Sequence, residues 1–226
     1  MRIMQRSFTS KISRTLLMLF LCLIGALLNI TINKIFTAGG GWILPLYLDT
    51  ILTITATFLG GLFWGILTGV LTNVIGHTIN FWGWEGYLFT LCSITTALIT
   101  WGFIRIFPQE IKITKNDNNH AAVPQNSQTL FRVINKIVVL ILLSFALCLA
   151  MSILGGLISA LIQIFGSSPA DELHLSALLG STMFPQMNVI LTEILSRIPI
   201  NIIDRLISVF AGFGVAIALS IFGKKR

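Results

Sequence analysis

The chain has 226 residues, of which 55% are hydrophobic and 10% are charged, and its net charge is +7. Soluble domains carry about 25% charged residues, so the composition excludes an ordinary soluble protein and predicts a single membrane domain over 1–226, in contact with lipid. Most basic residues lie outside the apolar runs, so membrane topology explains the positive charge. No nucleic-acid partner is expected, because no basic face with a recognisable binding fold supports one.

The first apolar run, at about 15–35, follows the basic residues Arg2, Arg6, Lys11 and Arg14. It is longer than the hydrophobic part of a secretory signal, and no cleavage site with small residues follows it. About 20 apolar residues cross a bilayer as a helix. We therefore expect an uncleaved first transmembrane helix.

The second apolar stretch, at about 43–79, is too long for one crossing and contains the pair Gly60 and Gly61. Paired glycines often mark a turn, so we expect one helix at 43–59 and another at 61–79. The two helices run in opposite directions. Asp49, near the start, and Asn73 and His77, near the end, therefore return to the same side of the membrane.

Three more transmembrane helices are expected at about 86–107, 130–154 and 199–222. The polar segment 108–129 is expected to be a loop, and Gly155 with Gly156 is expected to break the fifth helix. The segment 166–198 contains SSPADELH, a turn followed by a helix start in which Ser168 or Asp171 is the candidate cap. Short helices are expected there at 171–180 and 187–197.

The basic residues favour six spans with both termini in the cytoplasm. This topology places 12 lysines and arginines in inner segments and three, namely Lys34, Arg197 and Arg205, in outer segments. The loop 108–129 is then cytoplasmic, and the segment 166–198 lies outside. The sequence thus predicts an all-α, polytopic protein of the cell membrane.

Polar residues of the apolar runs gather on the outer side of this topology. Ionisable groups within spans usually face the bundle interior or a cavity. Because the inner halves are plain aliphatic helix, the pattern indicates a binding pocket open to the outside rather than an ion path across the membrane. The candidate substrate-binding residues are Asn29, Trp42, Tyr47, Asp49, Asn73, His77, Asn80, Trp82, Trp84, Glu85, Asn201, Asp204 and Arg205.

These residue types suit a small organic ligand. The aromatic side chains can stack on a flat ring, and Asp49 can accept hydrogen bonds from ring N–H or hydroxyl groups. Arg205 or Arg197 can bind a carboxylate or a phosphate.

Each candidate also has a structural explanation. Asp49 can pair with Arg205 or Lys34 to hold the outer ends together, and Asp204 with Arg205 can be a structural pair. Asn73 and His77 can hydrogen-bond between helices. The two tryptophans after the third helix can be anchors at the membrane interface.

Two patches resemble the substrate-binding S components of energy-coupling factor (ECF) transporters. The first comprises PLYLDTI at 45–51, the turn LGG at 59–61 and LTN at 71–73, which are similar to the second and third helices of that family. The second patch, DRLIS at 204–208, is similar to its last helix. The size of the chain, its six expected spans and its terminal charges fit the family as well.

The resemblance implies a function in uptake. An S component binds a vitamin or related micronutrient from outside and delivers it to a transmembrane T component driven by two cytoplasmic ATPases. The chain has no phosphate-binding loop of its own, so it cannot itself couple nucleotide hydrolysis. It is not expected to be an enzyme.

The chain departs from the family pattern in its first helix. The family's Ala-x-x-x-Ala docking motif, which lets helices approach closely, is met only in part by Cys22, Gly25 and Ala26. These three are the candidate residues for docking on the T component. The start Met1-Arg2-Ile3 lacks the histidine of the metal-transporting branch, so nickel or cobalt is not expected as cargo.

No cofactor or metal site is expected. The cysteines, Cys22, Cys92 and Cys148, lie within apolar runs without metal-ligand spacing and fit as small packing residues. The alternative function is a membrane sensor or interaction subunit that binds a small ligand without transport. An intramembrane enzyme is disfavoured, because Ser93 and His77 show no informative spacing for a nucleophile and its base.

Overall fold

The structure is a computed structural model that describes residues 15–16, 18–25, 27–28, 31, 48–80, 84–111, 125–165 and 188–222. All regular elements in these ranges are helical. In chain order they are η1 (Leu48–Thr50), α2 (Ile51–Gly60), α3 (Leu62–Asn80), η2 (Trp84–Phe89), α4 (Thr90–Ile106), α5 (Pro108–Ile111), α6 (Gln125–Phe165) and α8 (Val189–Phe222). The described residues between 15 and 31 are helical as well.

Among the described residues, four helices are long and apolar enough to cross a membrane. They cover Leu62–Ile79, Gly86–Ile106, Leu130–Ile162 and Val189–Ile221. The protein is therefore an all-helical membrane protein in its described part. The six-span topology and the cytoplasmic position of both termini stay predictions.

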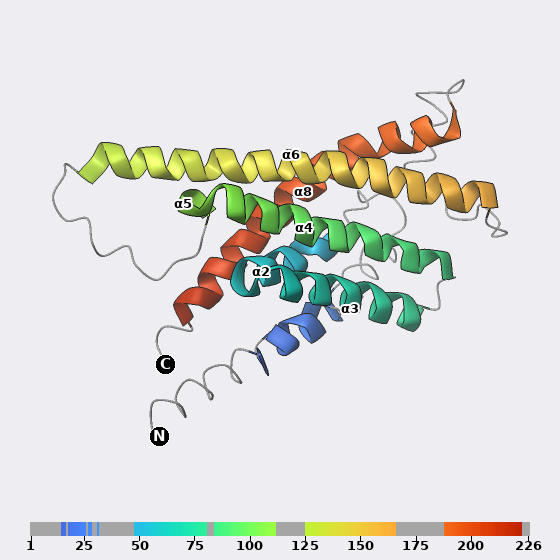
Figure 1. The fold of residues 1–226 in the computed structure, drawn as a ribbon, viewed down its shortest axis with the longest axis horizontal. Coiled ribbons are helices and arrows are strands. Elements are labelled where there is room, and N and C mark those ends of the chain that lie inside the picture. The colour runs from blue at the N-terminus through green and yellow to red at the C-terminus, as the bar shows by residue number, and fades with distance from the viewer. Residues whose placement is uncertain are drawn as a thin grey trace.

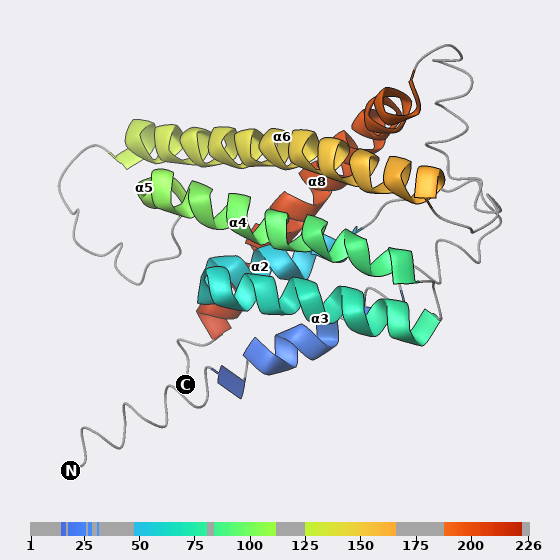
Figure 2. The ribbon, with the colours of Figure 1, turned by 45° about the vertical axis from the view of Figure 1, so that its right-hand side comes forward.

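The helices form a bundle crossed by one oblique member. In Figure 1, α6, α4 and α3 lie roughly side by side, and α8 crosses them at a steep angle. Figure 2 shows the same crossing after rotation, with α2 held between α3 and α8. The short helix α2 packs against α3, α4 and α8, so it lies at the centre of the bundle.

Paired glycines turn the chain between α2 and α3. Gly61 has φ +88°, a backbone conformation that favours glycine, and its N–H donates to the carbonyl of Thr57. The long apolar stretch is thus divided at the expected place. The first helix of the pair differs from expectation within the described residues, because α2 has only 10 residues and is preceded by the 3-10 turn η1.

The fifth predicted helix does not end at Gly155 and Gly156. Instead α6 runs unbroken over 41 residues, from Gln125 to Phe165. A β-carbon added at Gly156 would lie 2.8 Å from the Cα of Ile194 and 2.9 Å from its backbone nitrogen. The glycine is therefore needed for the close approach of α8, and it does not break α6.

The last predicted helix also begins earlier than expected. Residues 189–222 form one helix of 34 residues with Pro199 inside it, so the expected break between 187–197 and 199–222 is absent. The start of the segment 166–198 lies outside the described residues. Because α8 starts at Val189, Asn201, Asp204 and Arg205 lie near its middle and not at its opening turn.

The apolar core of the described residues brings together α2, the middle of α6 and the second half of α8. It is built from Ile54 on α2, from Leu143 and Leu147 on α6 and from Val209 and Phe213 on α8, with partly buried aromatic residues around them. Phe58 meets the ring of Phe213 edge-on at 5.1 Å. This described cluster is therefore held by apolar packing.

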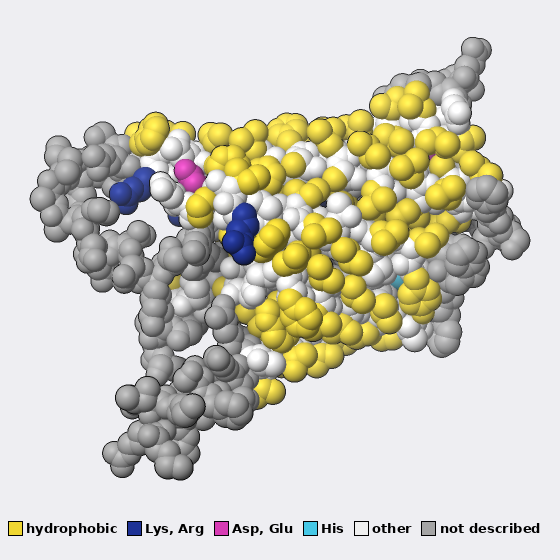
Figure 3. Space-filling view, in the orientation of Figure 1, with side chains coloured by type: hydrophobic (Ala, Val, Ile, Leu, Met, Phe, Trp, Pro, Cys, Tyr) yellow, Lys and Arg dark blue, Asp and Glu magenta, His cyan; other side chains and the backbone are white. Residues whose placement is uncertain are grey.

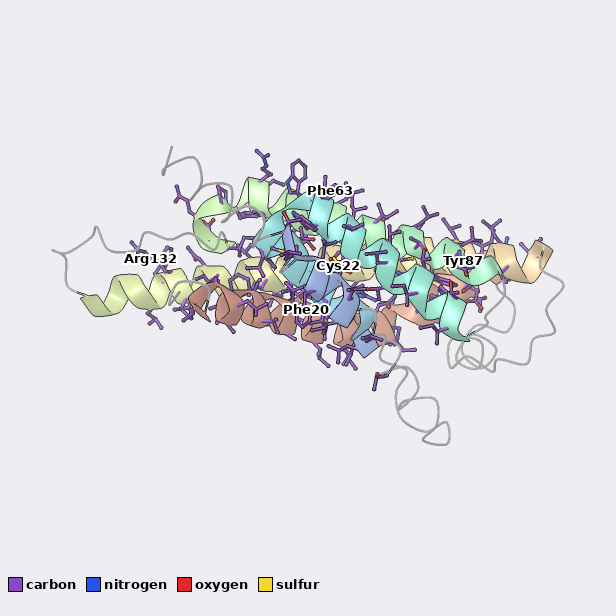
Figure 4. The ribbon with its side chains drawn as sticks, turned by 90° about the horizontal axis from the view of Figure 1, so that it is seen from below. Phe20, Cys22, Phe63, Tyr87 and Arg132 are labelled. Carbon is purple, nitrogen blue, oxygen red and sulfur yellow. The ribbon has the colours of Figure 1, made fainter. Side chains whose placement is uncertain are left out.

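Three of the five described lysines and arginines lie toward one end of the molecule. Arg105 lies in the last turn of α4, and Arg132 and Lys136 lie in the first part of α6. Figure 3 shows separate patches of Lys and Arg side chains in the left-hand part of one face, which is otherwise largely hydrophobic. In Figure 4, Arg132 lies at one end of the bundle and Tyr87 near the opposite end. We call the end with Arg105, Arg132 and Lys136 the basic end.

Candidate functional site

Buried ionisable and amide side chains occur in the half of the bundle away from the basic end. Among the described residues these are Asn73, His77, Glu193, Asn201, Asp204 and Arg205. They come from the second half of α3 and the first half of α8. Buried hydroxyl groups, in contrast, occur along the whole bundle.

Glycines on α3 bring that helix close to α4. A β-carbon at Gly65 would lie 3.1 Å from the Cβ of Ala97, and one at Gly69 would lie 2.8 Å from the Cβ of Ser93. The four residues form two matching rows of small side chains, which allow close helix contact in membranes. This contact places Asn73, one turn beyond Gly69, against α4.

Asn73 ties the two helices together. Its Nδ2 donates to Ser93 Oγ at 2.6 Å and to the carbonyl of Gly69 at 2.9 Å. Both donors of the amide are therefore used within the bundle. These contacts show that Asn73 forms a hydrogen bond between α3 and α4, which is its structural explanation.

His77 lies one turn further along α3, beneath the 3-10 helix η2. A β-carbon at Gly86 would meet its Nδ1 at 2.6 Å, so only glycine leaves room for the imidazole. The Tyr87 ring is 5.6 Å from the imidazole, and its hydroxyl is 3.1 Å from Thr78 Oγ1. His77 is thus buried by residues that follow α3 in the chain.

Polar residues on α8 face α6. Asn201 Nδ2 donates to Ser152 Oγ at 2.9 Å, and Arg197 donates to Ser159 Oγ. Glu193 Oε2 lies 3.7 Å from Arg197 Nε, one helical turn away. A polar lane, defined here as Glu193, Arg197, Asn201 and Arg205, therefore follows one side of α8 at every fourth residue.

The lane ends at a buried ion pair. Arg205 Nη2 lies 2.8 Å from Asp204 Oδ2, and Arg205 Nη1 donates to Thr50 Oγ1 at 2.6 Å. Asp204 is fully buried, and Arg205 is 5% exposed. Thr50 is the last residue of η1, so the arginine connects α8 to the start of α2.

Other predicted site residues are described in part or not at all. The structure gives only the backbone of Asp49 in η1, of Asn80 at the end of α3 and of Trp84 and Glu85 in η2. Outside the described residues lie Asn29, Trp42, Tyr47, Trp82 and Ala26. Among the described candidates, Asn73 and His77 lie on α3, whereas Asn201, Asp204 and Arg205 lie on α8.

The two other docking candidates face the interior of the chain. Cys22 is fully buried, with its Sγ 3.1 Å from Thr68 Oγ1 on α3. A β-carbon at Gly25 would lie 3.3 Å from Leu52 on α2. Cys22 and Gly25 therefore pack against α2 and α3 of the same chain, and their role in docking on a T component stays a prediction.

Sequence reasoning missed three partners of the candidate residues. Ser93, Ser152 and Thr50 accept hydrogen bonds from Asn73, Asn201 and Arg205, respectively. Small hydroxyl residues in apolar runs are common, so no pattern singles them out. A signal was available only for Ser152, which lies on α6. The polar residues on α8 recur at every fourth position, and such a polar stripe requires polar partners on the facing helix.

A shallow hollow between α6 and α8 does not coincide with these groups. It is lined by Ser144, Phe145, Cys148, Ile202 and Leu206, none of which is a predicted substrate residue. Among the described His, Cys, Asp and Glu residues, no group of three or more is placed to hold a metal ion. The polar half of the bundle is therefore the best candidate site.

No family model, curated protein or solved structure matches this chain.

Proposed function

We propose that the protein is the substrate-binding S component of an ECF-type importer. In this role it captures a vitamin or related small organic micronutrient from outside and passes it to a T component with two ATPases in the cell membrane. The proposal rests on one observation: the described buried ionisable and amide side chains lie in the half of the bundle away from the basic end. With the positive-inside rule, that half is the outer one.

This asymmetry favours capture over conduction. Polar groups buried in a membrane are unfavourable and tend to mark ligand or ion sites. A continuous ion path would require comparable groups along the whole bundle, whereas the described core beyond Arg205, built from Ile54, Leu143, Leu147, Val209 and Phe213, is apolar. A site that is closed on the inner side needs a partner to release its cargo there, as the ECF mechanism provides.

Uptake into cells tests the proposal. Radiolabelled micronutrients are offered to cells that express the chain with its T component and ATPases, and to cells that lack the chain. We expect ATP-dependent accumulation of one compound only when the chain is present. The matched variants are Arg205→Ala, which removes the buried cation, and Arg105→Ala, which removes an exposed cation at the basic end.

The expected result is loss of accumulation with Arg205→Ala and retention with Arg105→Ala, at equal amounts of folded protein in the membrane. Binding of a compound without any accumulation would instead support the sensor alternative. Equal accumulation by both variants would contradict a binding site in the outer half.

A further inference from the structure

The Asp204–Arg205 pair has hydrogen-bonding capacity that its surroundings do not use. Asp204 Oδ2 and Arg205 Nη2 are 2.8 Å apart but lack hydrogen-bond geometry. Both carboxylate oxygens, and Nε of the guanidinium, are buried without a hydrogen-bond partner. One turn further along α8, the hydroxyl of Ser208 is fully buried and also has no partner.

A purely structural pair does not explain this arrangement. A buried charge is strongly unfavourable unless its hydrogen bonds are satisfied. Elsewhere in the same bundle, buried amides meet this requirement, because Asn73 bonds Ser93 and Asn201 bonds Ser152. The link from Arg205 to Thr50 fixes α8 on η1, but it leaves the Asp204 carboxylate with an ion pair to Arg205 and no hydrogen bond.

The unused atoms define the chemistry of a matching ligand. The carboxylate offers two acceptors, Arg205 Nε offers one donor, and the Ser208 hydroxyl can serve as either. The pair carries no net charge. It therefore disfavours a free anion, which the carboxylate repels, and a free metal cation, which the guanidinium repels.

We propose that Asp204, Arg205 and Ser208 bind the edge of a neutral ring that has an N–H donor beside a C=O acceptor, as in a cyclic amide or urea. The N–H donates to the carboxylate of Asp204, and the C=O accepts from Arg205 Nε. This inference rests on the proposed function and specifies the substrate class of the same site. Since the pair is covered, binding requires movement of the segments packed against this side of α8.

The experiment measures equilibrium binding to the purified full chain in lipid nanodiscs. The probes are riboflavin, folate and biotin, whose rings carry an N–H beside a C=O, and nicotinate and pyridoxine, whose rings lack this edge. A matched probe, 3-methylriboflavin, keeps the flavin ring but replaces its N–H with a methyl group.

Two substitutions test the residues. Ser208→Ala removes the hydroxyl next to the pair, and Ser220→Ala is its matched control on the same helix, where the hydroxyl only bonds the carbonyl of Ile217. Asp204→Asn removes the acceptor charge. We expect Asp204→Asn to raise the Kd of the bound ring amide about 10- to 100-fold, as loss of a hydrogen bond to a charged group does.

The outcomes separate this inference from the proposed function. Binding of a ring-amide probe that is weakened by Asp204→Asn and Ser208→Ala but not by Ser220→Ala supports both. Binding of nicotinate or pyridoxine alone overturns the ring-amide assignment and leaves the proposed function standing. Binding of no ring-amide probe overturns the ring-amide assignment, and the uptake assay then decides the proposed function. If Asp204→Asn does not fold, the Ser208→Ala and Ser220→Ala pair, with the N-methylated probe, decides the result.

Discussion

Buried polar side chains in this protein differ in whether the bundle satisfies their hydrogen bonds. Asn73 and Asp204 show the difference. Asn73 has both amide donors bonded inside the bundle, so its contacts explain its presence. Asp204 has an ion pair but no hydrogen bond in the described structure. We therefore expect substitution of Asn73 to lower stability, and substitution within the Asp204–Arg205 pair to lower ligand binding as well as stability.

Removing the Asn73–Ser93 bond should lower stability. In membrane proteins such bonds contribute about 0.6 kcal/mol on average and up to about 1.7 kcal/mol. A double-mutant cycle with Asn73→Ala and Ser93→Ala, followed by denaturant unfolding in detergent, should give a coupling energy in this range. Thr95→Ala on the exposed face of α4 is the control, because its hydroxyl bonds only the carbonyl of Leu91. A coupling energy of zero would show that the bond contributes nothing.

The Asp204–Arg205 pair predicts a different pattern. Removal of one charged partner leaves the other buried, at a loss of about 3–5 kcal/mol, whereas replacement of both by apolar residues is often neutral or stabilising. We expect the single variant Arg205→Leu to unfold readily. The double variant Asp204→Leu/Arg205→Leu should regain much of the lost free energy of unfolding. The double variant should nevertheless bind no ligand. Regained stability with retained binding would show that the pair is structural only.

At the scale of helices, glycine decides how closely they approach. Gly69 and Gly156 lie where a β-carbon would come within 3 Å of a neighbouring helix, whereas nothing lies within 4 Å of such an atom at Gly102 or Gly214. Glycines within helices can therefore differ in their tolerance to the same substitution.

Gly69→Ala should separate α3 from α4. Its β-carbon would come 2.8 Å from the Cβ of Ser93, so the helices must shift or the packing must fail. We expect a loss of about 1–3 kcal/mol, typical of overpacking. Gly102→Ala on α4 should be tolerated, because the added methyl group meets open space. Thermal unfolding in the same detergent compares the two variants, and equal effects would contradict the packing described here.

Gly156→Ala tests the contact between α6 and α8. The added methyl group would press on the backbone of Ile194, which cannot rotate away. It should also displace Arg197 and Asn201, which bond α6 just beyond this contact. Gly214→Ala, on α8 in open space, is the matched control. Gel-filtration profiles and melting temperatures should show loss for Gly156→Ala alone.

At the scale of the molecule, the sequence predicted the helical membrane class and the approximate extents of α3 and α4. Hydrophobic runs of sufficient length require helices in lipid, since each backbone group must be bonded within its own segment. For the same reason glycine and proline break helices less readily there. The expected ends at Gly155 and before Pro199 therefore failed, and α6 and α8 continue through both.

The sequence indicated which polar residues to consider for the candidate site, but not how their side chains are arranged. Counting polar residues along the chain found Asn73, Asn201 and Arg205, but it could not show which hydroxyl each one binds. It also placed Arg205 at the start of a helix, because the preceding segment was expected to be separate. Partner choice depends on how helices cross, and crossing depends on close contacts such as those at Gly69 and Gly156.

The most direct test of the central claim is ligand binding by the chain alone in nanodiscs, without T component or ATPases. The account predicts that one micronutrient of the probe panel binds with micromolar affinity or better, that Arg105→Ala binds it equally well, and that folded Arg205→Ala does not. Failure of every compound to bind, or equal binding by the two arginine variants, would contradict a solute site in the outer half of the bundle.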